Sequence, residues 1–331
     1  MDCRSGKTTG KMKKHLRKNE LISLIVMMAI TAAFLVTCKN QGAPAVKETP
    51  TSGDIKIVAD ESFQPIIDAE AATFTSLYRY ASITPVYKTE REMIADFLND
   101  SVKVIVTSWT PTEEHKQLLL DALTVIRTTT VAYDALALVM HKSNNDSLLT
   151  YDEVEGIFTG KITDWNQINP SSKLGRINIV FDNDRSGNIR YFREKFALPD
   201  KLPDNFFAVN NNPEVIEYVS KSPDALGIVS VNWISDSDDS LSVSFINKVK
   251  VAGVSMQYLD KSTFYLPVQG SIFEKTYPFV REINMVSRET FSGLGSGFIT
   301  WVSGEQGQRI ILKSGLVPAT MPIRLIQVKN E

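Results

Sequence analysis

The segment Ile55-Lys56-Ile57-Val58-Ala59, followed by Asp60-Glu61-Ser62-Phe63-Gln64-Pro65, contains the pattern on which the fold prediction depends. Its first five residues are rich in apolar, β-branched side chains and predict a strand. The next six combine turn-forming and hydroxyl side chains with a proline, which is typical of a helix start. A strand, a short polar loop and a helix start in this order predict an α/β protein.

The same polar loop before a helix start recurs twice along the chain. The other copies are Lys88-Thr89-Glu90-Arg91 and Asp182-Asn183-Asp184-Arg185-Ser186-Gly187-Asn188. Further strands are predicted at residues 102–106, 135–140, 177–181 and 227–231. Because strands alternate with helical segments, we expect mostly parallel sheets.

Apolar side chains at helical spacing predict three helices between these strands. Their apolar faces are Met93, Ile94, Phe97 and Leu98; Leu118, Leu119, Ala122 and Leu123; and Ile189, Phe192 and Phe196. Two helix starts have the capping-box pattern, Thr89 with Glu92 and Thr110 with Glu113. In the second, Pro111 is expected at the first helical position.

Composition excludes several classes of protein. With 331 residues, 43% apolar and 22% charged, the chain can form two domains of ordinary size. A net charge of -2 argues against nucleic acid as a partner. The three histidines, His15, His115 and His141, lack the spacing of metal ligands, so neither a metal nor another cofactor is expected. The sequence also lacks the common nucleophile motifs, so we expect that the protein is not an enzyme.

The N-terminal residues have the pattern of an export signal. Residues 7–18 are basic, and an apolar run from Leu21 to Val36 follows, too short for a typical spanning helix. We expect a signal peptide at residues 1–37, and a tether rich in Pro, Gly, Ser and Thr at residues 38–53. An uncleaved membrane anchor is the alternative, and the true start is either Met1 or Met12.

The three polar loops suggest where an anion binds. A helix N-terminus exposes unpaired N–H groups and a partial positive charge, so it binds oxyanions, and Ser or Thr hydroxyls add donors. Each of Ser62, Thr89 and Ser186 could instead be only a helix cap, and Arg185 only a surface charge. Spacing alone does not bring the three loops together.

Several segments resemble the phosphate-binding proteins of phosphate ABC importers. These are residues 131–139 (VAYDALALV), 157–166 (FTGKITDWN preceded by Ile157), 185–188 (RSGN), 291–298 (FSGLGSGF), 306–308 (QGQ) and 315–318 (GLVP). The end of the apolar run, Leu35-Val36-Thr37-Cys38, resembles a lipobox, although Thr37 departs from it. That resemblance implies lipidation, such as palmitate, at Cys38 and a membrane-anchored lipoprotein of the bacterial envelope, facing the periplasm.

The resemblance implies a type II periplasmic-binding-protein fold, in which two α/β lobes are joined by two crossover strands. Crossings are expected near Thr130-Val131-Ala132 and Ile228-Val229-Ser230. Lobe 1 would then comprise residues 54–131 and 229–331, and lobe 2 residues 132–228. A monomer is expected.

Matched to the family's motifs, the resemblance implies a ligand site that closes around inorganic phosphate. Its expected residues are Ser62, Phe63, Thr89, Ser108, Arg185, Ser186, Gly187 and Asn188. A carboxylate, Asp60, Asp182 or Asp184, would accept the proton of the ligand. The closed protein would deliver phosphate to an ABC permease. The alternatives are a surface or sensor lipoprotein without transport, or a binder of another tetrahedral oxyanion.

Overall fold

The computed structural model describes residues 48–258 and 261–322, to which all structural statements below refer. The predicted signal peptide, Cys38 with its proposed lipid, and most of the tether lie outside these residues. Within the described part of the chain, no helix has the length and apolar character needed to cross a bilayer.

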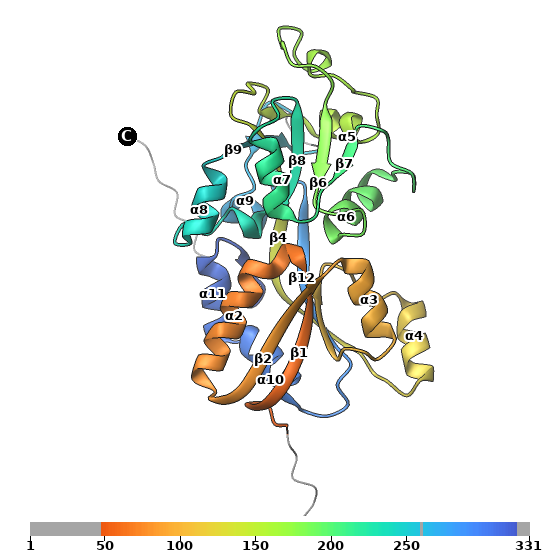
Figure 1. Cartoon of the computed structure of the whole chain (residues 1–331), viewed down its shortest axis with the longest axis vertical. Helices are drawn as coiled ribbons and strands as arrows, with labels where there is room; N and C mark the ends of the chain where they lie inside the picture. Colours follow the sequence, from red (N-terminus) through yellow and green to blue (C-terminus); the bar gives the residue numbers. More distant parts are fainter. Residues whose placement is uncertain (1–47, 259–260, 323–331) are drawn as a thin grey trace, which may run out of the picture. The chain divides into compact units, whose positions relative to one another are not determined.

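The described residues form an α/β structure (Figure 1). The strands are β1 (Ser52–Asp60), β2 (Tyr80–Lys88), β3 (Val104–Thr107), β4 (Arg127–His141), β5 (Leu148–Leu149), β6 (Asn178–Phe181), β7 (Phe206–Ala208), β8 (Ala225–Ser230), β9 (Val249–Val251), β10 (Gly253–Ser255), β11 (Phe264–Tyr265), β12 (Val280–Ser287) and β13 (Val317–Pro318). The α-helices are α2 (Gln64–Leu77), α3 (Glu90–Leu98), α4 (Glu113–Asp121), α5 (Tyr151–Phe158), α6 (Gly187–Phe196), α7 (Asn212–Val219), α8 (Ser240–Ile246), α9 (Gln269–Phe273), α10 (Leu294–Val302) and α11 (Glu305–Lys313). Short 3-10 helices are η1 (Glu61–Phe63), η2 (Trp165–Gln167) and η3 (Val231–Trp233).

The strands form a mixed sheet in the order β2-β1-β3-β12-β4-β8-β6-β7. β1 pairs in parallel with β2 and β3, and β6 pairs in parallel with β7 and β8. In the centre, β12 and β4 run antiparallel to each other. The predicted α/β class is therefore confirmed, whereas the sheet is mixed rather than mostly parallel.

Two lobes meet along β4 and β12. We call lobe 1 the part around β1, β2 and β3 with α2, α3, α4, α10 and α11, and lobe 2 the part around β6, β7 and β8 with α5, α6 and α7 (Figure 1). Strand β4 pairs with β12 over residues 127–135 and with β8 over residues 136–140, so it crosses from one lobe to the other. We propose that this is the first crossing, close to the predicted Thr130-Val131-Ala132.

The second crossing lies later in the chain than predicted. β8 ends at Ser230, but β9 still pairs with residues 139–141, at the lobe 2 end of β4. The chain returns along β12, which pairs with β3 in lobe 1. We therefore propose that lobe 2 extends from about residue 136 to 279, because strand pairing keeps residues 249–255 with that lobe.

The globular body also begins before the predicted Asp54. Ser52 is already paired with Tyr80 in the β1–β2 ladder. Glu48 Oε1 accepts a hydrogen bond from the N–H of Leu294, 3.1 Å away, at the start of α10. Residues 48–53 are therefore part of the lobe 1 structure rather than a tether.

The predicted strands and two of the three predicted helices agree with the structure. Ile189, Phe192 and Phe196 are buried on α6, where Phe158 and Phe192 stack with ring centroids 4.3 Å apart. The helix predicted around Leu118 is shorter than expected. Thr112 rather than Thr110 is the N-cap of α4, and Leu123 lies beyond its end with φ 55° and 90% exposed.

Candidate functional site

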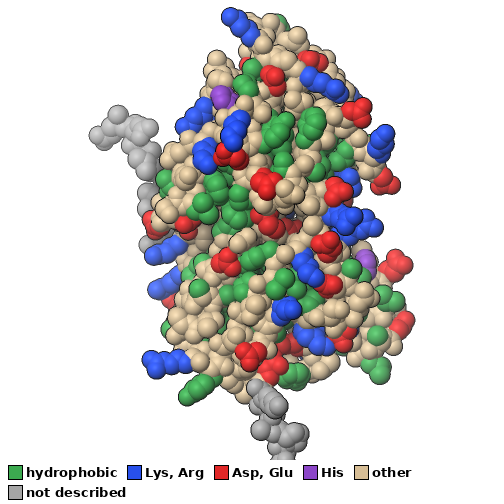
Figure 2. All heavy atoms as spheres, viewed as in Figure 1, with side chains coloured by type: hydrophobic (Ala, Val, Ile, Leu, Met, Phe, Trp, Pro, Cys, Tyr) green, Lys and Arg blue, Asp and Glu red, His purple; other side chains and the backbone are tan. Residues whose placement is uncertain are grey.

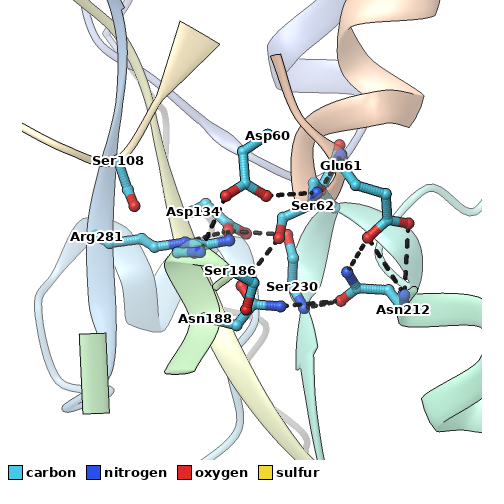
Figure 3. A network of polar contacts seen from close by, with 12 residues as sticks. Asp60, Glu61, Ser62, Ser108, Asp134, Ser186, Asn188, Asn212, Ser230 and Arg281 are labelled. Carbon is cyan, nitrogen blue, oxygen red and sulfur yellow. Dashed lines mark hydrogen bonds and ion pairs between the residues drawn. The ribbon is translucent and has the colours of Figure 1, made fainter. Parts of the chain in front are cut away.

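A buried polar loop ends β1 in lobe 1. The side chain of Asp60 caps η1, because its Oδ1 accepts from Ser62 N at 2.9 Å. Asp60 and Ser62 are 2% and 0% exposed. This loop therefore holds a carboxylate and a hydroxyl away from water, at the edge of the lobe that faces lobe 2 (Figure 3).

A second polar loop precedes α6 in lobe 2. Ser186 is the N-cap of α6 and accepts from Ile189 N. Asp182 organises the loop, since its Oδ1 accepts from Ser186 Oγ at 2.7 Å and its Oδ2 from Asn188 Nδ2 at 3.0 Å. The N–H of Gly187, at the first position of the helix, is thereby presented to lobe 1.

The two loops are in direct contact. Gly187 N donates to Asp60 Oδ2 at 3.0 Å. Ser62 Oγ donates to Asn188 Oδ1, also at 3.0 Å (Figure 3). A Cβ on Gly187 would lie 2.9 Å from both Asp60 Oδ2 and Glu90 Oε2, so only glycine permits this approach. A carboxylate from one lobe thus occupies the position at a helix N-terminus where an oxyanion ligand can bind.

A buried arginine lies in the same cluster. Arg281, on β12, has a side chain only 3% exposed, and its Nε and Nη2 each lie 2.9 Å from Asp134 Oδ2. Its guanidinium stacks on Phe63 at 4.7 Å from the ring centroid. Neither Nη1 nor Nη2 has a partner of hydrogen-bond geometry among the described residues, so this cation keeps donor capacity for a further acceptor.

Glu90 and Arg190 form a second contact between the lobes. Glu90, at the start of α3, is 2% exposed and accepts from Thr107 Oγ1 at 2.9 Å and Ser108 Oγ at 3.2 Å. Arg190, on α6, pairs with Glu90 and donates to Ser108 Oγ at 2.9 Å. A lobe 2 guanidinium therefore neutralises a lobe 1 carboxylate beside the α6 N-terminus.

Glu61 and Asn212 form a third contact between the lobes. Asn212 Nδ2 donates to Glu61 Oε2 at 2.7 Å, while Asn212 Oδ1 accepts from Ser230 N at 2.9 Å (Figure 3). Burial raises the pKa of Glu61 to about 8. The described conformation is thus a closed one, in which side chains of the two lobes bind each other directly.

Burial dominates the electrostatics of the cluster. It raises the pKa of Asp182 to about 7, with the nearby charge of Asp60 adding to the effect. The pKa of Asp60 is also raised, by burial and then by Glu90, while Arg281 opposes the shift. Burial likewise raises the pKa of Asp134. Near neutral pH Glu61, and in part Asp182, therefore keep a proton that a solvent-exposed carboxylate would have lost.

The structure brings together five of the eight predicted site residues. Ser62, Gly187 and Asn188 take part in the contact between the two loops, Ser186 caps α6 beside it, and Phe63 lies under Arg281. Ser108 is adjacent, at the contact between Glu90 and Arg190. The hydroxyl of Thr89 accepts from Glu92 N as the cap of α3 and makes no contact with the two loops.

Arg185 lies outside the cluster. Its side chain is 52% exposed and faces Glu92 at 3.6 Å and Asp184 at 3.9 Å, both exposed carboxylates. The reason is local, because Asn183 Oδ1 accepts from Arg185 N and so fixes a turn just before the N-cap. Asp184 is exposed as well, which leaves Asp60 and Asp182 as the buried carboxylates among the three predicted proton acceptors.

Sequence reasoning missed Arg281, Arg190 and Asp134. Asp134 is a single acid within an apolar run of β4, a pattern that indicates a buried, paired charge, whereas Arg281 is followed by Glu282 in β12 and has no such signal. Arg190 lies one turn after Gly187 on the same helix face as the cap, which helical spacing could have indicated. The pairing of these residues across the lobes needed the tertiary structure.

The cluster offers hydrogen-bond donors to an anionic ligand. It contains N–H, hydroxyl, amide and guanidinium donors but neither histidine nor cysteine, and Ser62 Oγ donates to an amide oxygen, not to a base. Among the described residues, no group of three or more His, Cys, Asp or Glu side chains is arranged to hold a metal ion.

Two α/β lobes, two strands that join them and a buried polar cluster between them define the class of two-lobed solute-binding proteins. The chain belongs to the PBP superfamily, because the family model described as "PBP superfamily domain" matches residues 44–305.

Relatives with curated functions point to one branch of this superfamily. The chain is 23% identical to the phosphate-binding protein PstS of Bacillus subtilis (strain 168) over 313 residues, which cover 92% of this chain and 96% of that protein. It is 21% identical to the PstS protein of Borreliella burgdorferi over 306 residues, which cover 89% of this chain and 97% of that protein.

Solved structures have the same fold. A Clostridium perfringens protein whose crystal structure contains bound phosphate aligns with a TM-score of 0.67 and 23% identity, covering 81% of this chain and all of that one. An ABC-type phosphate transport receptor from Vibrio cholerae aligns with a TM-score of 0.61 and 21% identity, covering 80% and 100%. The predicted type II fold and the predicted resemblance to phosphate-binding proteins are therefore confirmed.

Proposed function

We propose that this chain is an extracytoplasmic solute-binding lipoprotein that captures inorganic phosphate between its lobes and delivers it to an ABC importer. The signal peptide at residues 1–37 and lipidation at Cys38 belong to the proposal. So do a monomeric state, attachment to a membrane and docking on a permease. The PstS relatives support the transport context.

The observation that carries the proposal is the buried guanidinium of Arg281. Its unpartnered donors lie in the cluster that also contains the N-terminus of α6. Although Arg281 pairs with Asp134, its spare donors favour an anionic acceptor, since buried donors without a hydrogen-bond partner are costly. The proposed ligand site consists of Ser62, Phe63, Ser108, Ser186, Gly187 and Asn188 with Arg281.

Asp60 has a defined part in this mechanism. In the closed form described above its carboxylate accepts the N–H of Gly187 from the opposite lobe. When the lobes open this contact is lost, and a phosphate oxygen can take the same N–H before the lobes close again. Phosphate therefore replaces a carboxylate of the protein as the acceptor of this N–H. The N–H of Gly187 has a hydrogen-bond acceptor both with and without bound phosphate.

A titration of the unlipidated mature chain, residues 38–331, tests the proposal. The protein is denatured and refolded to remove carried ligand, then titrated with phosphate, sulfate and molybdate by calorimetry. We expect heat with phosphate and a much weaker response to sulfate, which has no proton to share with a buried carboxylate at neutral pH. A strong response to sulfate or molybdate alone would identify another tetrahedral oxyanion as the ligand.

The second candidate is a surface or sensor lipoprotein that keeps the fold without transport. The observation in its favour is the acidity of the closed cluster, where Asp60, Glu90, Asp134 and Asp182 outnumber Arg190 and Arg281. Like charges disfavour a second anion. Absence of heat with all three oxyanions would support this candidate.

A further inference from the structure

A cavity of about 400 Å³ opens beside the closed cluster, between α3 and α4 of lobe 1 and α6 of lobe 2. Its walls contain apolar side chains, an indole, an imidazole and several charged groups. Among the lining residues are Arg91, Trp109, His115, Arg190 and Arg193. The volume is that of a small organic molecule, several times larger than one phosphate group.

The charged groups of this cavity are unevenly paired. Four arginines line it, against the three carboxylates Glu90, Asp184 and Glu194. Arg190 pairs with Glu90 and Glu194, and Arg185 faces Asp184 and Glu92. Arg91 and Arg193 have no carboxylate within 4.0 Å among the described residues, so two guanidiniums remain uncompensated. The wider surface mixes both charges (Figure 2).

The two uncompensated arginines come from opposite lobes. Arg91 is on α3, and its N–H donates to the carbonyl of Arg185 at 3.3 Å, so the lobes already touch at this point. Arg193 is on α6, where Nη2 donates to the carbonyl of Asp200 at 3.2 Å and the buried Nε has no partner. An anion that contacts both would be held by one guanidinium from each lobe, and guanidinium groups suit phosphate oxygens.

The rest of the wall suits an aromatic group. Trp109 and His115 pack edge to face with ring centroids 5.2 Å apart. His115 Nδ1 is 2.6 Å from Thr112 Oγ1, which fixes the imidazole ring. Ile94 and Ile189 add apolar surface from the two lobes. Aromatic and apolar walls around a few charged groups are typical of a site for an organic anion.

We propose that this cavity, which we call the side pocket, binds an aromatic phosphate monoester, with its phosphate between Arg91 and Arg193 and its ring against Trp109. The proposal goes beyond the capture of inorganic phosphate. It rests on the proposed function in one respect, namely that the two lobes close around an anion. The side pocket borders the proposed ligand site, since Ser186, Glu90 and Arg190 line it. Asp60, Ser62 and Gly187 do not line it.

The test uses phenyl phosphate as the probe and the unlipidated mature chain, residues 38–331. Calorimetric titrations compare phenyl phosphate with inorganic phosphate, benzoate and phenol. We expect Arg91→Gln to weaken phenyl phosphate binding about tenfold or more, because it removes a charge-assisted contact. Phosphate binding should change less than about twofold in this variant. Arg309→Gln, which removes an exposed arginine of α11, is the matched control.

Several outcomes separate this proposal from the proposed function. If inorganic phosphate binds but phenyl phosphate does not, the side pocket is overturned and phosphate capture remains. If phenyl phosphate binds, is lost in Arg91→Gln and does not compete with inorganic phosphate, the side pocket is supported. Loss of phenyl phosphate binding in Ser62→Ala but not in Arg91→Gln would overturn the side pocket, as would benzoate binding of equal strength. Arg193→Gln gives a second variant if Arg91→Gln does not fold.

Discussion

Two helices of this protein begin with a carboxylate on their first N–H groups, but the carboxylates come from different places. At α10, Glu289 accepts from Gly295 N at 3.1 Å and Ser296 N at 2.6 Å, and Glu48 accepts from Leu294 N, all within lobe 1. At α6, the N–H of Gly187 binds Asp60 of the opposite lobe. The first contact can serve only the stability of one lobe, whereas the second can be exchanged when the lobes separate.

The largest effect is expected for the buried cation of the exchangeable site. Arg281→Gln leaves Asp134 buried without its counter-ion, so the free energy of unfolding in urea should fall by about 3 kcal/mol. Phosphate affinity should also fall at least about tenfold. The double variant Arg281→Gln with Asp134→Asn should recover much of the stability but none of the affinity. Recovery of both would show that Arg281 holds only Asp134.

The next effect isolates the permanent site. Glu289→Ala leaves the N–H groups of Gly295 and Ser296 without their acceptor, which should lower the free energy of unfolding by about 2 kcal/mol. Phosphate affinity should not change, because Glu289 acts within lobe 1. Glu305→Ala, an exposed acid in the first turn of α11, is the control and should have little effect. A loss of phosphate binding at full stability would contradict the distinction between the two helices.

Asp60→Asn should have a smaller effect than the two variants above. It should strengthen phosphate binding rather than weaken it. The variant removes the negative charge that competes with the ligand at Gly187, so phosphate should bind about tenfold more tightly by calorimetry. Asp184→Asn removes an exposed acid near the same helix and should change affinity little. Weaker binding in Asp60→Asn would mean that Asp60 accepts the ligand's proton rather than holding its place.

Counted for each pH unit, the smallest effect is expected for the pH dependence of stability, at a carboxyl group that accepts no hydrogen bond from a helix N–H. Glu70, on α2, is fully buried, neither of its oxygens has a hydrogen-bond partner among the described residues, and burial raises its pKa to about 9. Between pH 4.5 and about 9 the folded protein keeps a proton that the unfolded chain has lost, so this group's contribution to stability falls as pH rises through that range.

Glu70→Gln should remove this part of the pH dependence. Urea unfolding at several pH values between 5 and 9 measures it, with the exposed Glu114→Gln as control. We expect the variant to lose less stability than the wild type as the pH rises, with a difference of about 1.4 kcal/mol for each pH unit in this range. Parallel curves for wild type and variant would show that the carboxyl of Glu70 titrates as it does in the unfolded chain.

Sequence patterns predicted the elements better than their contacts. The strand that ends at Asp60 and the helix that follows Ser186 were predicted because apolar runs and cap residues are local signals. The second crossing was predicted too early, since strand pairing over long separation decides it. The burial of β8 does not distinguish a strand that stays within lobe 2 from one that leaves it.

Only part of the site was predicted from the sequence, because caps leave a local signal and long-range contacts do not. Helix caps such as Ser62 and Ser186 have a local signature, so the two loops that meet were found. Whether a charge points inward is not local, and Arg185 was therefore placed in the site although its side chain is exposed. Arg281 is distant in sequence from both loops, and only the packing of β12 against β4 brings it to them.

Nuclear magnetic resonance of glycine amides tests the central claim most directly. The stripped, ¹⁵N-glycine-labelled mature chain is titrated with phosphate while the amides of Gly187 and Gly295 are followed. Exchange of the Asp60 carboxylate for a phosphate oxygen predicts a saturable shift of the Gly187 resonance, with Gly295 at α10 unchanged. Phosphate binding by calorimetry with no change at Gly187, or with equal shifts at both glycines, would contradict the account.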